Sequence, residues 1–80
     1  MDILIATVTY TFMDNGENID VRILQDRDTG KLYSHLPELN AELADAPAMS
    51  TVDAIAYIRD EVAYWDNVEV VELADQDDFE

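Results

Sequence analysis

Residues 50–65, STVDAIAYIRDEVAYW, constrain the fold most, because they form the one stretch long and periodic enough to predict a helix. Ser50 followed by Asp53 has the form of a capping box, with Asp in place of the usual Glu. The apolar residues recur at helical spacing and share a face that needs a sheet to bury it: Val52, Ile55, Ile58, Val62 and Trp65. The sequence therefore predicts one long helix packed across a sheet.

The chain before this helix predicts a three-stranded antiparallel meander. Residues 3–13 and 19–25 alternate and are rich in β-branched residues, and residues 31–33 begin a third strand. The turns between them, at 14–18 and 26–30, each contain a glycine, and we expect them at opposite ends of the sheet. In the first strand the predicted core face consists of Leu4, Ala6, Val8, Tyr10 and Phe12.

The rest of the chain predicts a short helix and a last strand. Residues 36–43 place Pro37 in the first turn of the short helix, and residues 68–73 read as a fourth strand. Val68 and Val70 share one phase of this strand, whereas Val71 and Leu73 share the other. Either a bulge or an edge strand that is apolar on both faces accommodates this pattern.

These elements predict an α+β fold: a three-stranded antiparallel meander, a short helix, one long helix packed across the sheet and a C-terminal fourth strand. We expect residues 1–74 to form a single α+β domain, since 80 residues suffice for one domain and no more. Residues 75–80 are an acidic tail that we expect to be disordered.

The charge of the chain restricts its partners. Nineteen Asp and Glu against four Lys and Arg give a net charge of −15. This charge repels nucleic acid and anionic membranes within the Debye length, about 8 Å at physiological salt. A basic protein is the natural partner, and basic protein grooves usually hold nucleic acid. The alternative is that the acidity serves only solubility or adaptation to a salty cytoplasm.

Residues that would indicate catalysis are sparse. The chain has no cysteine, and its single histidine, His35, stands at no spacing that indicates a catalytic group. Asp26, Asp28 and Gly30 match part of a calcium-binding loop, but the later Glu of such a loop is missing. We therefore predict no enzymatic activity, no metal and no cofactor. The start of the chain resembles neither a signal peptide nor a membrane span, which predicts a cytoplasmic location.

Two acidic groups are candidates for binding a partner. One is a stripe of carboxylates and tyrosines on the outer side of the predicted helix, about 16 Å long at a rise of about 1.5 Å per residue. The other is the acidic tail. For both, the alternative is a solvated surface. The candidate partner-binding residues are Asp53, Tyr57, Asp60, Glu61, Tyr64, Asp75, Asp77 and Asp78.

A very acidic, cysteine-free chain of this size resembles the small inhibitors that bacteriophages use against host defences, the DNA-mimic and anti-CRISPR proteins. The resemblance lies in size and charge. It implies a phage protein, a monomer or dimer, that binds and blocks a basic nucleic-acid-binding surface of a host defence protein. Such a protein would act in the cytoplasm of the host cell.

Two further interpretations remain open. The β-β-β-α-β order, a meander followed by a capped helix, is similar to the HicB-type antitoxin domain, which implies a small basic toxin as the partner. Alternatively, one lysine against 19 acids fits the composition of halophilic proteins, in which the acidity has no mimicry role.

Overall fold

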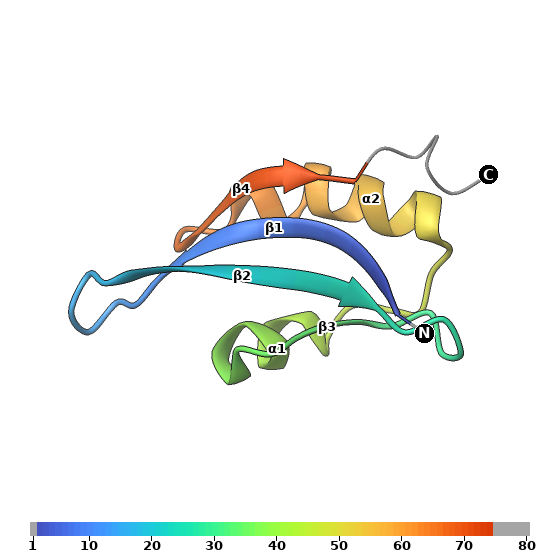
Figure 1. The fold of residues 1–80 in the computed structure, drawn as a ribbon, viewed down its shortest axis with the longest axis horizontal. Coiled ribbons are helices and arrows are strands. Elements are labelled where there is room, and N and C mark those ends of the chain that lie inside the picture. The colour runs from blue at the N-terminus through green and yellow to red at the C-terminus, as the bar shows by residue number, and fades with distance from the viewer. Residues whose placement is uncertain (1, 75–80) are drawn as a thin grey trace.

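The computed structural model describes residues 2–74, which form an α+β fold (Figure 1). The strands are β1 (Ile3–Thr11), β2 (Asn18–Gln25), β3 (Leu32–Ser34) and β4 (Val68–Leu73). The helices are α1 (Pro37–Leu43), α2 (Thr51–Asp60) and the 3₁₀ helix η1 (Val62–Tyr64). Within the described residues the strands make one four-stranded antiparallel sheet in the order β3-β2-β1-β4.

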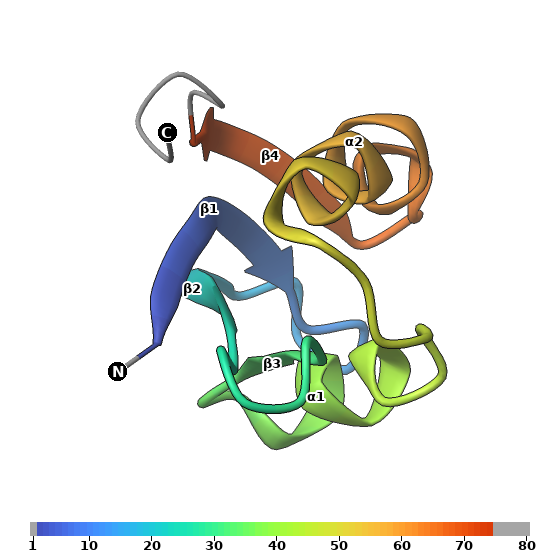
Figure 2. The same ribbon diagram turned by 90° about the vertical axis from the view of Figure 1, so that its right-hand side faces the viewer.

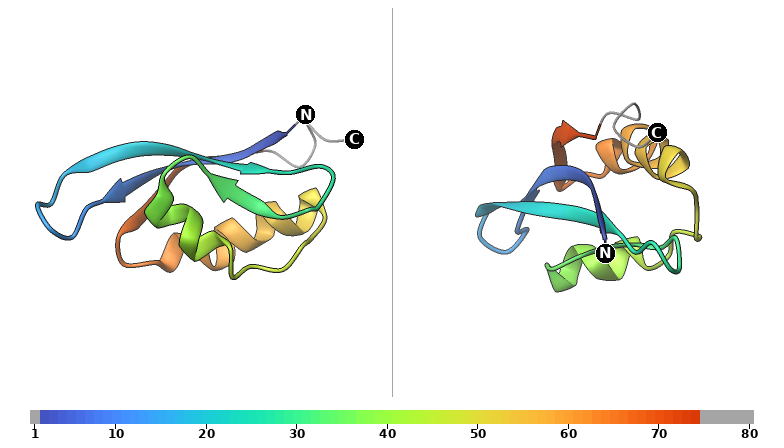
Figure 3. Two further views of the ribbon diagram at one scale, coloured as in Figure 1. Left: turned by 90° about the horizontal axis from the view of Figure 1, so that it is seen from below. Right: turned by 45° about the vertical axis from the view of Figure 1, so that its right-hand side comes forward.

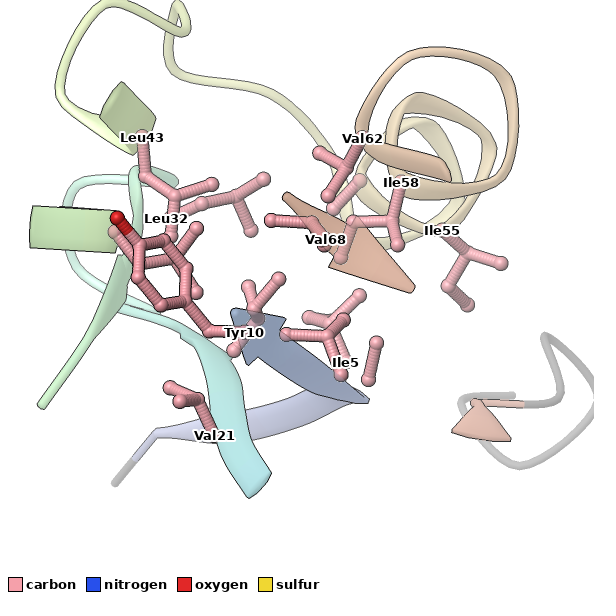
Figure 4. Close-up of a cluster of buried hydrophobic side chains, with 14 residues drawn as sticks. Ile5, Tyr10, Val21, Leu32, Leu43, Ile55, Ile58, Val62 and Val68 are labelled. Carbon is pink, nitrogen blue, oxygen red and sulfur yellow. The ribbon is translucent and has the colours of Figure 1, made fainter. Parts of the chain in front are cut away.

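The sheet is curved, and α1 and α2 lie on the same side of it (Figures 2 and 3). Helix α1 lies beside β3, while α2 lies against β1 and β4 at the other edge. The core fills the space between the sheet and these helices (Figure 4). Its largest fully buried side chains are Ile5, Ile23, Leu39, Leu43, Ile58, Val8 and Val62.

The predicted architecture was wrong in its main helix, because no long helix crosses the sheet in residues 2–74. Helix α2 ends at Asp60 after ten residues, and the chain continues as η1. Val62 lies in η1, and Trp65 is the extended residue that caps it. Both still contact the core, although the backbone is no longer α-helical. At the other end, the predicted core residue Val52 is 48% exposed.

The start of α2 follows the prediction. The Ser50 side chain accepts a hydrogen bond from the backbone N–H of Asp53 at 3.1 Å, as an N-cap residue does. Asp53 also places a negative charge in the first turn, and Arg59 places a positive charge in the last turn. Both charges complement the helix dipole.

The strands also do not lie in chain order. β4 pairs with β1, with Tyr10 opposite Val68, so β1 is central and β3 lies at the opposite edge. The pairing of β4 shifts register, and Val71 is the extra residue, 63% exposed. The structure therefore contains the predicted bulge, and β4 also lies at an edge of the sheet.

A second irregularity changes the core face of β1. The register against β2 shifts between Leu4 and Ala6, and both Ile5 and Ala6 are buried. The prediction that Leu4 faces the core was wrong, since the bulge leaves it 45% exposed. Beyond the bulge the predicted alternation is confirmed, with Val8 and Tyr10 buried.

The short helix α1 is held against the sheet by two buried leucines and one hydrogen bond. Pro37 occupies its first turn, and Leu39 and Leu43 are fully buried. The Asn40 side chain accepts the backbone N–H of Ser34 at 3.2 Å. Taken together, these contacts fix α1 against β3. Across residues 2–74, no helix combines the length and apolar character needed to cross a membrane.

Candidate binding cleft

The break after α2 divides the predicted acidic stripe. Asp53 and Asp60 are exposed on α2, and the Asp60 carboxylate lies 3.5 Å from Nε of Arg59. Glu61 is the C-terminal cap residue of α2, and Tyr64 belongs to η1. The structure therefore does not present these residues as one helical face. The other predicted binding residues, Asp75, Asp77 and Asp78, lie outside the described residues.

Tyr57 and Tyr64 instead help to line a cleft of about 540 Å³, which we call the acidic aromatic cleft. One wall comes from the end of α1 and the turn that follows it. The other wall comes from α2, η1 and the turn into β4. Its lining residues are Glu42, Asp45, Tyr57, Tyr64, Trp65, Asp66 and Asn67.

The first wall is held in place by the core and by Lys31. Leu43 is fully buried (Figure 4), so the last turn of α1, which carries Glu42, is anchored to the core. Lys31 Nζ donates hydrogen bonds to the carbonyl oxygens of Ala44 at 3.2 Å and Ala46 at 2.6 Å. These carbonyls flank Asp45, so the ammonium group fixes the backbone that positions the Asp45 carboxylate.

The second wall is anchored to the same core. Val62 is fully buried and points into the core from η1 (Figure 4). Trp65 donates its backbone N–H to the carbonyl of Val62 at 3.1 Å, and its side chain packs partly against the core. The carbonyl of Asn67 accepts the backbone N–H of Thr11 at 2.9 Å, which joins this turn to β1. Tyr64, in contrast, is 80% exposed.

The cleft is electrostatically negative. Its lining includes the carboxylates of Glu42, Asp45 and Asp66, and among the described residues it includes no lysine or arginine. Burial raises the pKa of the Tyr57 hydroxyl, and the nearby carboxylates of Glu61 and Asp45 raise this pKa further. An added negative charge is thus disfavoured here, whereas a positive charge is favoured.

Two other groups that the sequence offered as candidates for chemistry are the Asp26 turn and His35, and the surroundings of both are those of ordinary structural residues. The Asp26 carboxylate accepts the backbone N–H groups of Asp28 and Thr29 at 2.8 and 3.4 Å, which is the geometry of a polar turn. His35 is exposed, and its ring lies edge-on to Tyr33 with centroids 6.0 Å apart. Over residues 2–74, no group of three or more His, Cys, Asp or Glu is placed to hold a metal ion.

Sequence reasoning missed most of the cleft. The helical spacing places Trp65 on the buried helix face, and no pattern in the sequence singles out Asp45. The run Tyr64-Trp65-Asp66 is the local signal that aromatic rings and a carboxylate occur together. Its pairing with Glu42 and Asp45 has no local signal, because these residues lie about twenty positions earlier in the chain.

Comparison of the chain with protein-family models, curated proteins and solved structures finds no match. The interpretation of the cleft therefore depends on its own geometry and charge.

Proposed function

We propose that this protein is a non-enzymatic inhibitor that binds and blocks a basic, nucleic-acid-binding surface of a host defence protein. The observation that carries the proposal is the acidic aromatic cleft, whose lining combines three carboxylates with the rings of Tyr57, Tyr64 and Trp65. This is the chemistry that complements lysine and arginine side chains.

The charge of the whole chain supports the same partner. Surfaces that hold nucleic acid use Lys and Arg to neutralise phosphates, and duplex DNA carries one charge per roughly 1.7 Å. A protein with a net charge of −15 is attracted electrostatically to such a basic surface, as nucleic acid is. In this mechanism the net charge accelerates encounter, and the cleft provides the close contacts that keep the partner bound.

The proposed place of action is the cytoplasm of the host cell, where complexes that bind invading nucleic acid would meet the inhibitor. Inhibition requires no reaction in this mechanism. The partner cannot bind the inhibitor and its nucleic acid at the same surface, so occupancy alone blocks it.

The test uses a panel of purified nucleic-acid-binding defence enzymes, each loaded with fluorescently labelled nucleic acid. Addition of the protein should release the label from at least one enzyme, as a fall in fluorescence anisotropy. Measured without nucleic acid, binding of the protein to that enzyme should weaken as salt rises, because the opposing charges are screened. The proposal is overturned if each enzyme keeps its nucleic acid at saturating protein concentrations.

Two triple variants with the same change of charge separate the cleft from the net charge. The cleft variant is Glu42→Gln with Asp45→Asn and Asp66→Asn. The control neutralises three exposed acids around the first hairpin turn: Asp14→Asn, Glu17→Gln and Asp20→Asn. We expect the cleft variant to lose release activity and the control to retain most of it. Equal losses would assign the effect to net charge and remove the cleft from the mechanism.

A further inference from the structure

We propose that the acidic aromatic cleft receives one arginine side chain of the partner, with the guanidinium stacked on an aromatic ring and hydrogen-bonded to the carboxylates. This inference rests on the proposed function for the identity of the protein that supplies the arginine. The chemistry of the cleft selects arginine over the other cations that an acidic surface attracts.

The aromatic rings are the first argument. Tyr64 is 80% exposed, so its ring has open faces, while Tyr57 and Trp65 are partly buried beside it in the lining. A cation over such a ring is attracted by the negative ring face. The guanidinium group is planar and weakly hydrated, so it stacks on aromatic rings more readily than the compact, strongly hydrated ammonium of lysine.

The carboxylates are the second argument. Guanidinium presents five N–H donors in a rigid fork, which matches carboxylate oxygens in a bidentate geometry. Glu42, Asp45 and Asp66 provide such oxygens from both walls of the cleft. The cleft volume of about 540 Å³ lies within the range of roughly 300–1,000 Å³ that is typical of small-ligand sites. The cleft is open to solvent, and this volume leaves room for an arginine side chain.

The basic residues Lys31 and Arg59 are bonded to groups other than the cleft carboxylates. Lys31 donates to the backbone carbonyls of Ala44 and Ala46, and Arg59 pairs with Asp60. None of these residues belongs to the lining. The cleft therefore has its negative charge available for a partner. A second copy of the chain is a poor source of the cation, because two chains of net charge −15 repel each other.

The experiment uses Trp65, which is the single tryptophan of the chain and lies in the cleft. Its fluorescence is recorded while the protein is titrated at low salt with acetyl-Gly-Arg-Gly-amide or with the lysine analogue. We expect saturable binding of the arginine peptide with a Kd on the order of 1 mM, as suits one side chain. The lysine peptide should bind about tenfold more weakly.

Four variants locate the binding. Asp45→Asn and Tyr64→Ala should each weaken the arginine peptide about tenfold, whereas Tyr64→Phe, which keeps the ring, should bind like the parent. Asp53→Asn is the matched control, because it removes one exposed carboxylate of α2 that lies outside the cleft lining. Circular dichroism confirms that each variant is folded before it is titrated.

The inference is overturned if arginine and lysine peptides bind equally, or if Asp53→Asn weakens binding as much as Asp45→Asn does. Failure of the proposed function is distinguishable. Enzyme release without arginine binding would leave the function standing and remove this inference. Arginine binding without enzyme release would keep the cleft as an arginine site and remove the proposed defence-enzyme target.

Discussion

The turns at residues 12–17 and 26–31 are built alike and lie at opposite ends of the sheet (Figure 1). In the first, which we call the open turn, Gly16 donates its N–H to the carbonyl of Phe12 at 2.8 Å. In the second, the closed turn, Gly30 donates to the carbonyl of Asp26 at the same distance. Both glycines have positive φ, 70° and 75°, a conformation that other residues rarely adopt.

Their surroundings differ completely. Among residues 2–74, a Cβ atom on Gly16 would meet nothing within 4 Å, whereas one on Gly30 would lie 2.9 Å from the carbonyl oxygen of Met49. The chain before α2 packs directly on the closed turn, and Met49 donates its N–H to the carbonyl of Gly30 at 3.0 Å. The comparison teaches that the same kind of glycine turn can be free at the surface at one end of a sheet and packed against another segment of the chain at the other end.

Buried Gln25 ties the closed turn to the chain that leads into α2. Its amide Nε2 donates to the carbonyls of Met49 at 2.8 Å and Gly30 at 3.3 Å, and its Oε1 accepts the hydroxyl of Thr51 at 2.8 Å. This one side chain therefore joins β2, the closed turn and the first residue of α2. The open turn, in contrast, faces solvent, since Met13 within it is 79% exposed.

The largest effect should come from Gly30→Ala. The positive φ and the forced contact with the Met49 backbone together should lower the free energy of unfolding by about 3 kcal/mol. Urea unfolding followed by circular dichroism measures this loss. A loss below that of the same change at Gly16 would contradict the distinction between the closed and open turns.

Gln25→Leu should have the next largest effect. Leucine keeps most of the volume but removes three hydrogen bonds, so the free energy of unfolding should fall by about 2 kcal/mol. Hydrogen exchange should also show faster opening of the first turn of α2. The exposed neighbour Arg22 on the same strand provides the control, since Arg22→Gln should change stability by less than about 0.5 kcal/mol.

Gly16→Ala tests the open turn alone. With no neighbour to clash, only the positive φ opposes alanine, and the free energy of unfolding should fall by about 1 kcal/mol. The same urea measurement applies. A loss as large as that of Gly30→Ala would show that the open turn makes contacts as tight as those of the closed turn.

The smallest expected effect is a dependence of stability on pH, which arises from Tyr33 at the end of the sheet where the closed turn lies. The hydrogen bond that the Tyr33 hydroxyl donates to the Asp2 carboxylate raises the pKa of Tyr33 to about 12. Between the ordinary tyrosine pKa of about 10 and this value, the folded protein keeps a proton that the unfolded chain loses. Stability should therefore fall as pH rises through this window. Absorbance titration of tyrosinate should show the high pKa, and Asp2→Asn should lower it.

Several features of the molecule could be predicted from residues alone. The N-cap at Ser50, the glycine turns and the alternation of β2 follow from local backbone chemistry and from a period of two. The predicted end of the helix failed because Val62 in η1 and Trp65 at its cap contact the core, as they would in a continuous α-helix. The two bulges, at Leu4–Ala6 and at Val71, depend on the partner strands rather than on the strand itself.

The sequence by itself determined the α+β composition of the chain, its turns and its net charge of −15, because these depend on residue type and on short-range spacing. Only the tertiary structure decided that β4 pairs with β1 and that Glu42 and Asp45 meet Tyr57, Tyr64 and Trp65 across one cleft. The physical reason is that the cleft exists between two segments whose places are fixed by burial of Leu43 and Val62 in a shared core. No local pattern encodes the distance between them.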